Sequence, residues 1–211
     1  ANPDVVAFTG FEWSQVGVTP AQHYGHKNVI FPDLAEDRLP ARPIAAEGVA
    51  ADAMKRGVTM PLTTILALPV MDYDQRERYL DLRIYMRDLM AVPACPDDVP
   101  TRDLPLDCKE SAATPAVLFD KLRQWDLGAM VIPHGTTWGF YTPPGYTYDK
   151  QLAPAMHDAS MQTLIEVHSG HGNSEEYRPW RAAIMPEGGY VEGGELPVCP
   201  EPSEGYEPCC W

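Results

Sequence analysis

A chain of 211 residues with 45% hydrophobic residues has the size and composition of one globular domain, which excludes a disordered chain. Its formal net charge of −14 disfavours nucleic acid and anionic membranes as partners, because phosphate groups are bound by clustered Lys and Arg. No apolar run approaches the roughly 20 residues that a membrane-spanning helix needs.

The N-terminal part of the chain contains two short β-prone runs. Residues 5–11 are apolar and predict a buried strand, with Glu12 at its carboxyl end. A polar loop then leads to a second short strand at residues 29–31. Residues 33–46 are rich in proline and charge, and they predict an irregular surface loop.

Three helices are expected in the middle of the chain. Residues 50–56 predict a short helix, and residues 74–90 predict the clearest one, which Pro93 terminates. Thr114 and Pro115 suit the N-cap and the first position of a third helix. Helical spacing gives the expected buried positions of the second helix as Tyr79, Leu82, Tyr85, Met86 and Leu89, and those of the third as Val117, Leu118, Leu122 and Trp125.

Two further apolar runs end in histidine. Residues 129–133 predict a strand with His134 at its end, and residues 164–167 predict a buried strand followed by His168 and His171. Strands that alternate with helices favour an α/β fold with parallel strands. In such folds the functional residues gather at the carboxyl ends of the strands, so these strand ends are expected to meet in one site.

The residues at these strand ends suit a transition-metal site. Imidazole nitrogens and a carboxylate form a reasonable shell for Zn, Mn or Fe, and an open position lets the metal activate water. We therefore expect Glu12, His134 and His171 to be ligands, and His168 to be a ligand or an outer contact. Glu12 is also suited to bridge two ions. The structural alternatives are a buried, paired acid at Glu12 and a hydrogen-bonded turn histidine at His134.

Other polar and aromatic residues are candidates for substrate contacts. His26, Lys27 and Arg178 suit an anionic substrate. A loop histidine such as His26 is more often simply solvated, and for Lys27 and Arg178 a surface charge is an equally good interpretation. Trp138 and Tyr141 are suited either to stack on a substrate or to pack in the core. A binding module that uses these two aromatic residues is therefore a further interpretation of the chain.

The five cysteines lie in loops with little apolar cover, and none forms a Cys-x-x-Cys pair. This distribution favours disulfides, and hence a periplasmic or extracellular location, over free buried thiols. We expect one bridge between Cys95 and Cys108, and a second from Cys199 to either Cys209 or Cys210. No signal peptide is visible at the start, as expected of a mature, processed or truncated chain.

Four motifs occur in order along the chain. They are Phe8–Trp13, Gly25–Phe31, Ile132–Gly135 and Ile165–Glu175. Together they resemble an uncharacterised branch of the PHP superfamily, the polymerase and histidinol phosphatase metallohydrolases. Members have a distorted (β/α)7 barrel that binds two or three metal ions, and many hydrolyse phosphate esters. The resemblance implies that Glu12 is the bridging glutamate, His134 the strand-end ligand and His171 the ligand after the Glu-hydrophobic segment.

The resemblance covers most of residues 5–180, without the superfamily's opening His-x-His and closing Asp-x-His motifs. We therefore expect an internal portion of a longer protein, with part of a (β/α)7 barrel at residues 1–180 and an irregular tail at 181–211. The expected function is a metal-dependent hydrolase of phosphoesterase type, with one to three Zn, Mn or Fe ions and a small, anionic substrate. A homo-oligomer is compatible with this interpretation. The alternative is a secreted, non-catalytic scaffold that keeps the fold without a complete metal shell.

Overall fold

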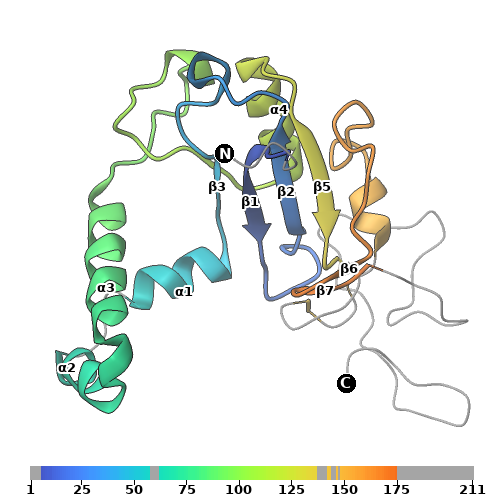
Figure 1. Ribbon diagram of the computed structural model, residues 1–211. Helices are drawn as coiled ribbons and strands as arrows, with labels where there is room; N and C mark the ends of the chain where they lie inside the picture. The colour runs from blue at the N-terminus through green and yellow to red at the C-terminus, as the bar shows by residue number, and fades with distance from the viewer. Residues whose placement is uncertain (1–5, 58–61, 137–141, 144–145, 147, 175–211) are drawn as a thin grey trace, which may run out of the picture.

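The computed structural model describes residues 6–57, 62–136, 142–143, 146 and 148–174. Its main sheet has three antiparallel strands in the order β1-β2-β5. These are β1 (Thr9–Gln15), β2 (Gly25–Phe31) and β5 (Met130–His134). Because β1 and β5 both run antiparallel to β2, they point in the same direction, and their carboxyl ends lie at one end of the sheet (Figure 1).

One face of this sheet packs on helix α4 (Pro115–Trp125) and forms the core. Side chains alternate between the two faces of a strand, so every second residue points toward α4. The fully buried apolar members of this set include Trp13, Val29 and Val131, which belong to one core cluster with Leu118 and Phe119 of the helix. The opposite face therefore carries the residues in between, which are mostly polar.

The remaining strands are very short. A parallel pair joins β3 (Ala45–Ala46) to β4 (Ser111–Ala112), and an antiparallel hairpin joins β6 (His168–Ser169) to β7 (Gly172–Asn173). The hairpin lies across the end of the main sheet where β1 and β5 finish (Figure 1). This position brings a segment far along the sequence to the edge of the polar face.

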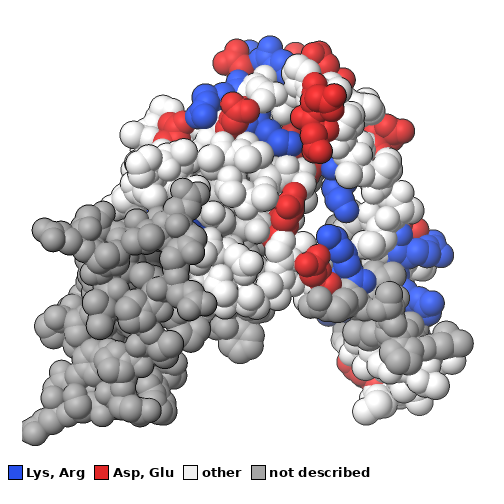
Figure 2. Space-filling view, turned by 180° about the vertical axis from the view of Figure 1, so that it is seen from behind, with Lys and Arg blue, Asp and Glu red and all other residues white. Residues whose placement is uncertain are grey.

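Three helices form an arm that projects from the sheet (Figure 1). They are α1 (Val49–Gly57), α2 (Leu62–Met71) and α3 (Arg76–Ala91). The space-filling view shows the arm standing apart from the rest, with charged side chains of both signs on the visible surface (Figure 2). Single-turn 3-10 helices occupy Glu36–Arg38, Tyr73–Gln75 and Thr101–Asp103, and a slightly longer one occupies Tyr148–Leu152. Among the described residues no helix combines the length and apolar character that crossing a membrane requires.

The expected (β/α)7 barrel with parallel strands is wrong. The described residues form a mixed α and β structure whose largest sheet is open, three-stranded and antiparallel. The physical reason lies in the connection between β1 and β2, which spans only residues 16–24. Parallel neighbours need a crossover of about a dozen residues or more, whereas antiparallel neighbours are joined by short loops.

Several elements agree with the sequence. Helices were expected at 50–56 and 74–90, and both are present as α1 and α3. Helix α4 begins as expected, because the side chain of Thr114 accepts a hydrogen bond from the backbone N–H of Val117 and Pro115 follows it. The predicted strand at 129–133 is β5, shifted by one residue.

Other expectations about burial and boundaries are wrong. Residues 164–167 form no strand, and Leu164 is 56% exposed. The first strand begins later than expected, so that Glu12 lies in the middle of β1 and not after its end. On the helices, Tyr85 and Val117 are exposed, because the projecting arm and the outer face of α4 have little of the described chain against them. Helix α2 was not expected.

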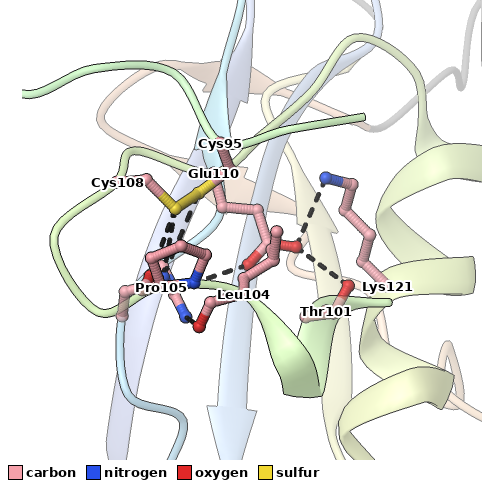
Figure 3. Close-up of a disulfide and its surroundings, with 8 residues drawn as sticks. Cys95, Thr101, Leu104, Pro105, Cys108, Glu110 and Lys121 are labelled. Atoms are coloured by element: carbon pink, nitrogen blue, oxygen red, sulfur yellow. Dashed lines mark hydrogen bonds and ion pairs between the residues drawn. A yellow bond between two sulfur atoms is a disulfide. The ribbon is translucent and has the colours of Figure 1, made fainter. Parts of the chain in front are cut away.

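The predicted bridge between Cys95 and Cys108 is confirmed. It closes the loop before β4, beside Leu104 and Pro105 (Figure 3). The guanidinium of Arg42 lies against both sulfur atoms and donates hydrogen bonds to the carbonyl oxygens of Leu104 and Pro105. The second predicted bridge falls outside the described residues, since it involves Cys199, Cys209 and Cys210.

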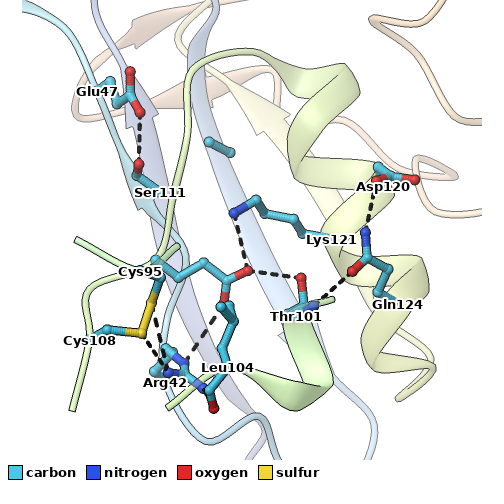
Figure 4. Close-up of polar contacts among 12 residues, drawn as sticks. Arg42, Glu47, Cys95, Thr101, Leu104, Cys108, Ser111, Asp120, Lys121 and Gln124 are labelled. Atoms are coloured by element: carbon cyan, nitrogen blue, oxygen red, sulfur yellow. Dashed lines mark hydrogen bonds and ion pairs between the residues drawn. A yellow bond between two sulfur atoms is a disulfide. The ribbon is translucent and has the colours of Figure 1, made fainter. Parts of the chain in front are cut away.

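A buried carboxylate ties this loop to α4. Glu110 is only 1% exposed and lies 3.3 Å from the ammonium of Lys121 (Figure 3) and 3.8 Å from Nε of Arg42. Figure 4 shows Arg42, Thr101 and Lys121 approaching this network from different sides. The hydroxyl of Thr101 donates a 3.0 Å hydrogen bond to it. Two cations and a hydroxyl offset the removal of this charge from water, so the network joins three separate segments.

Candidate metal centre

Four potential ligand residues converge on the polar face of the main sheet. Glu12, His26, His134 and His171 each offer one donor atom, and these four atoms all lie within 4.8 Å of one another. The group contains the three expected ligands and adds His26, which was expected only to contact substrate. Three imidazoles and one carboxylate form a donor set suited to a divalent transition metal.

The register of the sheet explains why three of these residues meet. Ser14 of β1, His26 of β2 and His134 of β5 stand directly opposite one another in a row across the sheet. Glu12 lies two residues from Ser14 and so points to the same face, where it reaches the row diagonally. The row lies near the end of the sheet at which β1 and β5 finish.

The fourth residue comes from the turn of the β6–β7 hairpin. His171 stacks on the ring of His26 with a centroid separation of 4.1 Å and an interplanar angle of 10°. Gly135 permits this approach: it adopts a φ of +56°, and a Cβ atom there would lie 3.2 Å from Cβ of His171. The glycine after His134 therefore gives the hairpin access to the sheet.

The distances around Glu12 have the scale of a coordination sphere. Its Oε1 atom lies 2.9 Å from Nδ1 of His26, 3.3 Å from Nε2 of His171 and 3.5 Å from Nε2 of His134. Ligand atoms on a tetrahedral zinc ion with bonds near 2.0–2.1 Å lie about 3.3–3.4 Å apart. The three measured separations bracket this value, and an ion would draw the widest pair of donors together.

The protonation states also suit metal binding. Burial lowers the pKa of His26 to about 4, and the neighbouring His171 adds to this effect against the raising influence of Glu12. Partial burial raises the pKa of Glu12, but the hydrogen bond from Ser14 and the positive field of His171 and His26 outweigh it and lower the pKa overall. Near neutral pH, Glu12 is thus an anion and His26 a neutral imidazole, the forms that bind metals.

A groove of about 360 Å³ opens beside the cluster. Glu12 and Asn28 line the end next to the histidines, and Phe8, Gly10 and Ile30 line the part further along the strands. Of the four cluster residues Glu12 lines the groove, so a small molecule there would lie against Glu12 and an apolar wall.

The other expected site residues lie elsewhere. His168 is on β6, paired with Asn173, and is not a member of the four-residue group. Lys27 points to the opposite face of the sheet, is fully buried, and donates hydrogen bonds to the carbonyl of Tyr24 and the side chain of Gln151. It therefore supports the fold and does not contact this site. Trp138, Tyr141 and Arg178 fall outside the described residues.

Sequence reasoning missed the role of His26 as a potential ligand. The sequence placed His26 in a loop, whereas it lies inside β2. The strand begins at Gly25, which has a φ of +68°. The available signal was the alternation along β2 of His26, Asn28 and Ile30 with Lys27, Val29 and Phe31. Val29 and Phe31 are fully buried apolar residues of the core, so His26 points to the opposite face.

Comparisons of this chain with protein-family models, with curated proteins and with solved structures found no match.

Proposed function

We propose that this protein is a metal-dependent hydrolase whose single divalent ion is held by Glu12, His26, His134 and His171. The observation that carries the proposal is the convergence of these four donor atoms within 4.8 Å, from three strands and a hairpin turn. Zn, Mn and Fe all accept such a mixed nitrogen and oxygen set.

The ion would supply a nucleophile. A bound Zn²⁺ lowers the pKa of its water to about 7. Some zinc sites expand to five ligands, and a water beside the four protein donors proposed here would need such a fifth position. The exposure of the Glu12 and His171 side chains, 37% and 39%, leaves the cluster open to water and substrate on that side. Such access would let a water molecule reach a fifth position on the ion.

Phosphate esters are the substrate class that we propose. The support is the motif resemblance to the polymerase and histidinol phosphatase metallohydrolases. The groove beside Glu12 and Asn28 adds space for a substrate with an apolar substituent. No Lys or Arg side chain appears among the described residues lining that groove, so the ion itself would carry most of the charge stabilisation.

The test measures bound metal and hydrolysis in the same preparation. The protein is stripped with a chelator, reloaded with Zn²⁺, Mn²⁺ or Fe²⁺, and assayed with p-nitrophenyl phosphate and bis-p-nitrophenyl phosphate. We expect one ion per chain and hydrolysis that depends on it, and we expect both to be reduced in Glu12→Gln. Glu77→Gln is the matched control, because the Glu77 side chain is 84% exposed on the arm. A chain that binds no metal would contradict the proposal and favour the alternative, a secreted, non-catalytic scaffold.

An oxidising compartment is also part of the proposal. The Cys95–Cys108 bridge supports it, since such bridges persist in periplasmic and extracellular proteins and are rare in the cytosol. Isolating the protein from each cell fraction with its thiols blocked would test the location.

A further inference from the structure

A second carboxylate lies on the far side of the His134 ring. Oε2 of Glu166 is 3.9 Å from Nδ1 of His134, while Nε2 of the same ring faces Oε1 of Glu12 at 3.5 Å. The two nitrogens of one imidazole thus face two different carboxylates. His134 is almost fully buried, and its Nδ1 atom has no hydrogen-bond partner among the described residues.

Glu166 is held in this position from two directions. Its backbone N–H donates a 3.1 Å hydrogen bond to the carbonyl of Pro133, the residue before His134. Its Oε2 atom accepts a 3.4 Å hydrogen bond from Nδ2 of Asn28 on β2. The hydrogen bond to Pro133 fixes the position of the Glu166 backbone beside β5. The side-chain amide of Asn28 holds the Glu166 carboxylate toward the metal cluster.

We propose that Glu166 is a positioning residue of the metal centre, which accepts the Nδ1 proton of His134 and so directs Nε2 toward the ion. This inference rests on the proposed metal-dependent function. A separation of 3.9 Å is too long for a hydrogen bond. The proposed role therefore requires the ring and the carboxylate to move closer together when the metal binds. Catalytic hydrogen bonds often tighten in this way on ligand binding.

Two physical arguments support this role. A buried imidazole N–H without an acceptor is destabilising, and Oε2 of Glu166 lies 3.9 Å from Nδ1 of His134. A metal-bound histidine commonly donates its other N–H to a carboxylate, which fixes the tautomer and makes the ligand nitrogen more basic. Asn28 completes the chain of contacts by holding the carboxylate in turn.

The experiment titrates the metal-free, full-length protein with Zn²⁺ by calorimetry. Loss of such an outer partner weakens metal binding about 10–100-fold. We expect that loss in Glu166→Ala, a smaller loss in Glu166→Gln, which still accepts a hydrogen bond, and no change in the control Glu77→Gln. Circular dichroism of each variant separates loss of metal affinity from loss of fold.

A second measurement needs no variant. Long-range ¹H–¹⁵N spectra of the Zn²⁺-loaded wild-type protein should show His134 protonated at Nδ1 and bound to the metal through Nε2. Metal bound through Nδ1, or wild-type affinity in Glu166→Ala, would overturn the role of Glu166 while leaving the metal centre standing. Failure of the wild-type protein to bind Zn²⁺ would overturn the metal centre itself, and the inference with it.

Discussion

Nδ1 of His26 lies 2.9 Å from Oε1 of Glu12, although the two residues are not direct neighbours across the β1–β2 ladder. The residue opposite Glu12 is Asn28, and the residue opposite His26 is Ser14. The contact is diagonal, and the hydroxyl of Ser14 lies 2.8 Å from both partners. The register of two antiparallel strands is therefore sufficient to bring two of the four residues of the candidate site together.

Removing His134 should remove most of the metal affinity. His134→Ala deletes one of four converging donors, and we expect Zn²⁺ binding to weaken by more than the roughly 100-fold that loss of an outer partner causes. His168→Ala is the matched control, because it deletes a histidine of the β6–β7 hairpin that lies outside the group of four. Metal content measured after dialysis decides the point, and equal content in the two variants would contradict the assignment of His134.

Gly135→Ala should disturb both the backbone and the site. A residue with a Cβ at this left-handed φ is destabilised by about 1–2 kcal/mol. The added methyl group would also meet Cβ of His171 at 3.2 Å and push the hairpin from the cluster. We expect a lower free energy of unfolding in urea together with weaker Zn²⁺ binding.

Gly170→Ala is the control for this change. Gly170 lies next to His171 in the turn of the β6–β7 hairpin, and a Cβ atom at this position would meet nothing within 4 Å. Zn²⁺ binding that is weakened equally in both variants would contradict this prediction. It would show that the close contact between Gly135 and His171 is not what positions His171 in the site.

The disulfide should contribute a substantial share of the stability. It joins residues separated by 13 positions, and closing a loop of this size stabilises a folded chain by about 3 kcal/mol in the chain-entropy model. The double variant Cys95→Ala/Cys108→Ala should therefore unfold at a lower urea concentration than the oxidised protein. Adding a reductant should bring the wild-type midpoint down to that of the variant and leave the variant unchanged; equal midpoints without reductant would show that the bridge adds nothing.

His23 should make the fold sensitive to mild acid. Burial lowers its pKa from 6.5 to about 3, with further lowering by His26 and the two nearby lysines. The unfolded chain therefore takes up a proton below pH 6.5 that the native chain does not. The contribution of neutral His23 to the free energy of unfolding is complete above that pH. It falls by about 1.4 kcal/mol per pH unit between pH 6.5 and 3.

Urea unfolding of His23→Gln at several pH values checks this prediction. The variant should lose that part of the pH dependence, because glutamine does not titrate. The same replacement at the exposed His157 is the control and should leave the slope as in the wild type. An unchanged slope in His23→Gln would show that His23 is not the group responsible.

Helices α1, α3 and α4 and the disulfide were predictable because their signals are local, whereas α2 was not expected. The cap formed by Thr114 and Pro115 specifies the start of α4 without reference to the rest of the chain. The two cysteines of the loop before β4 lie close enough in sequence to suggest their own pairing. The burial of Tyr85 was not predictable in this way, because helical periodicity shows that a face is apolar and not what covers it.

The direction of the strands was beyond the local signals. Apolar runs with intervening helices indicated parallel strands, but the short connection from β1 to β2 reverses the chain. The expected meeting of Glu12 and His134 survives this correction, because β1 and β5 still point the same way on either side of β2.

By itself the sequence determined which chemical groups were available, namely Glu12, His134 and His171 beside apolar runs, and a cysteine pair in a polar loop. Only the tertiary structure decided that His26 joins them, that His168 does not, and that Glu166 lies behind His134. The reason is that strand register and the docking of a hairpin turn depend on contacts between residues more than a hundred positions apart, which no local pattern of residues specifies.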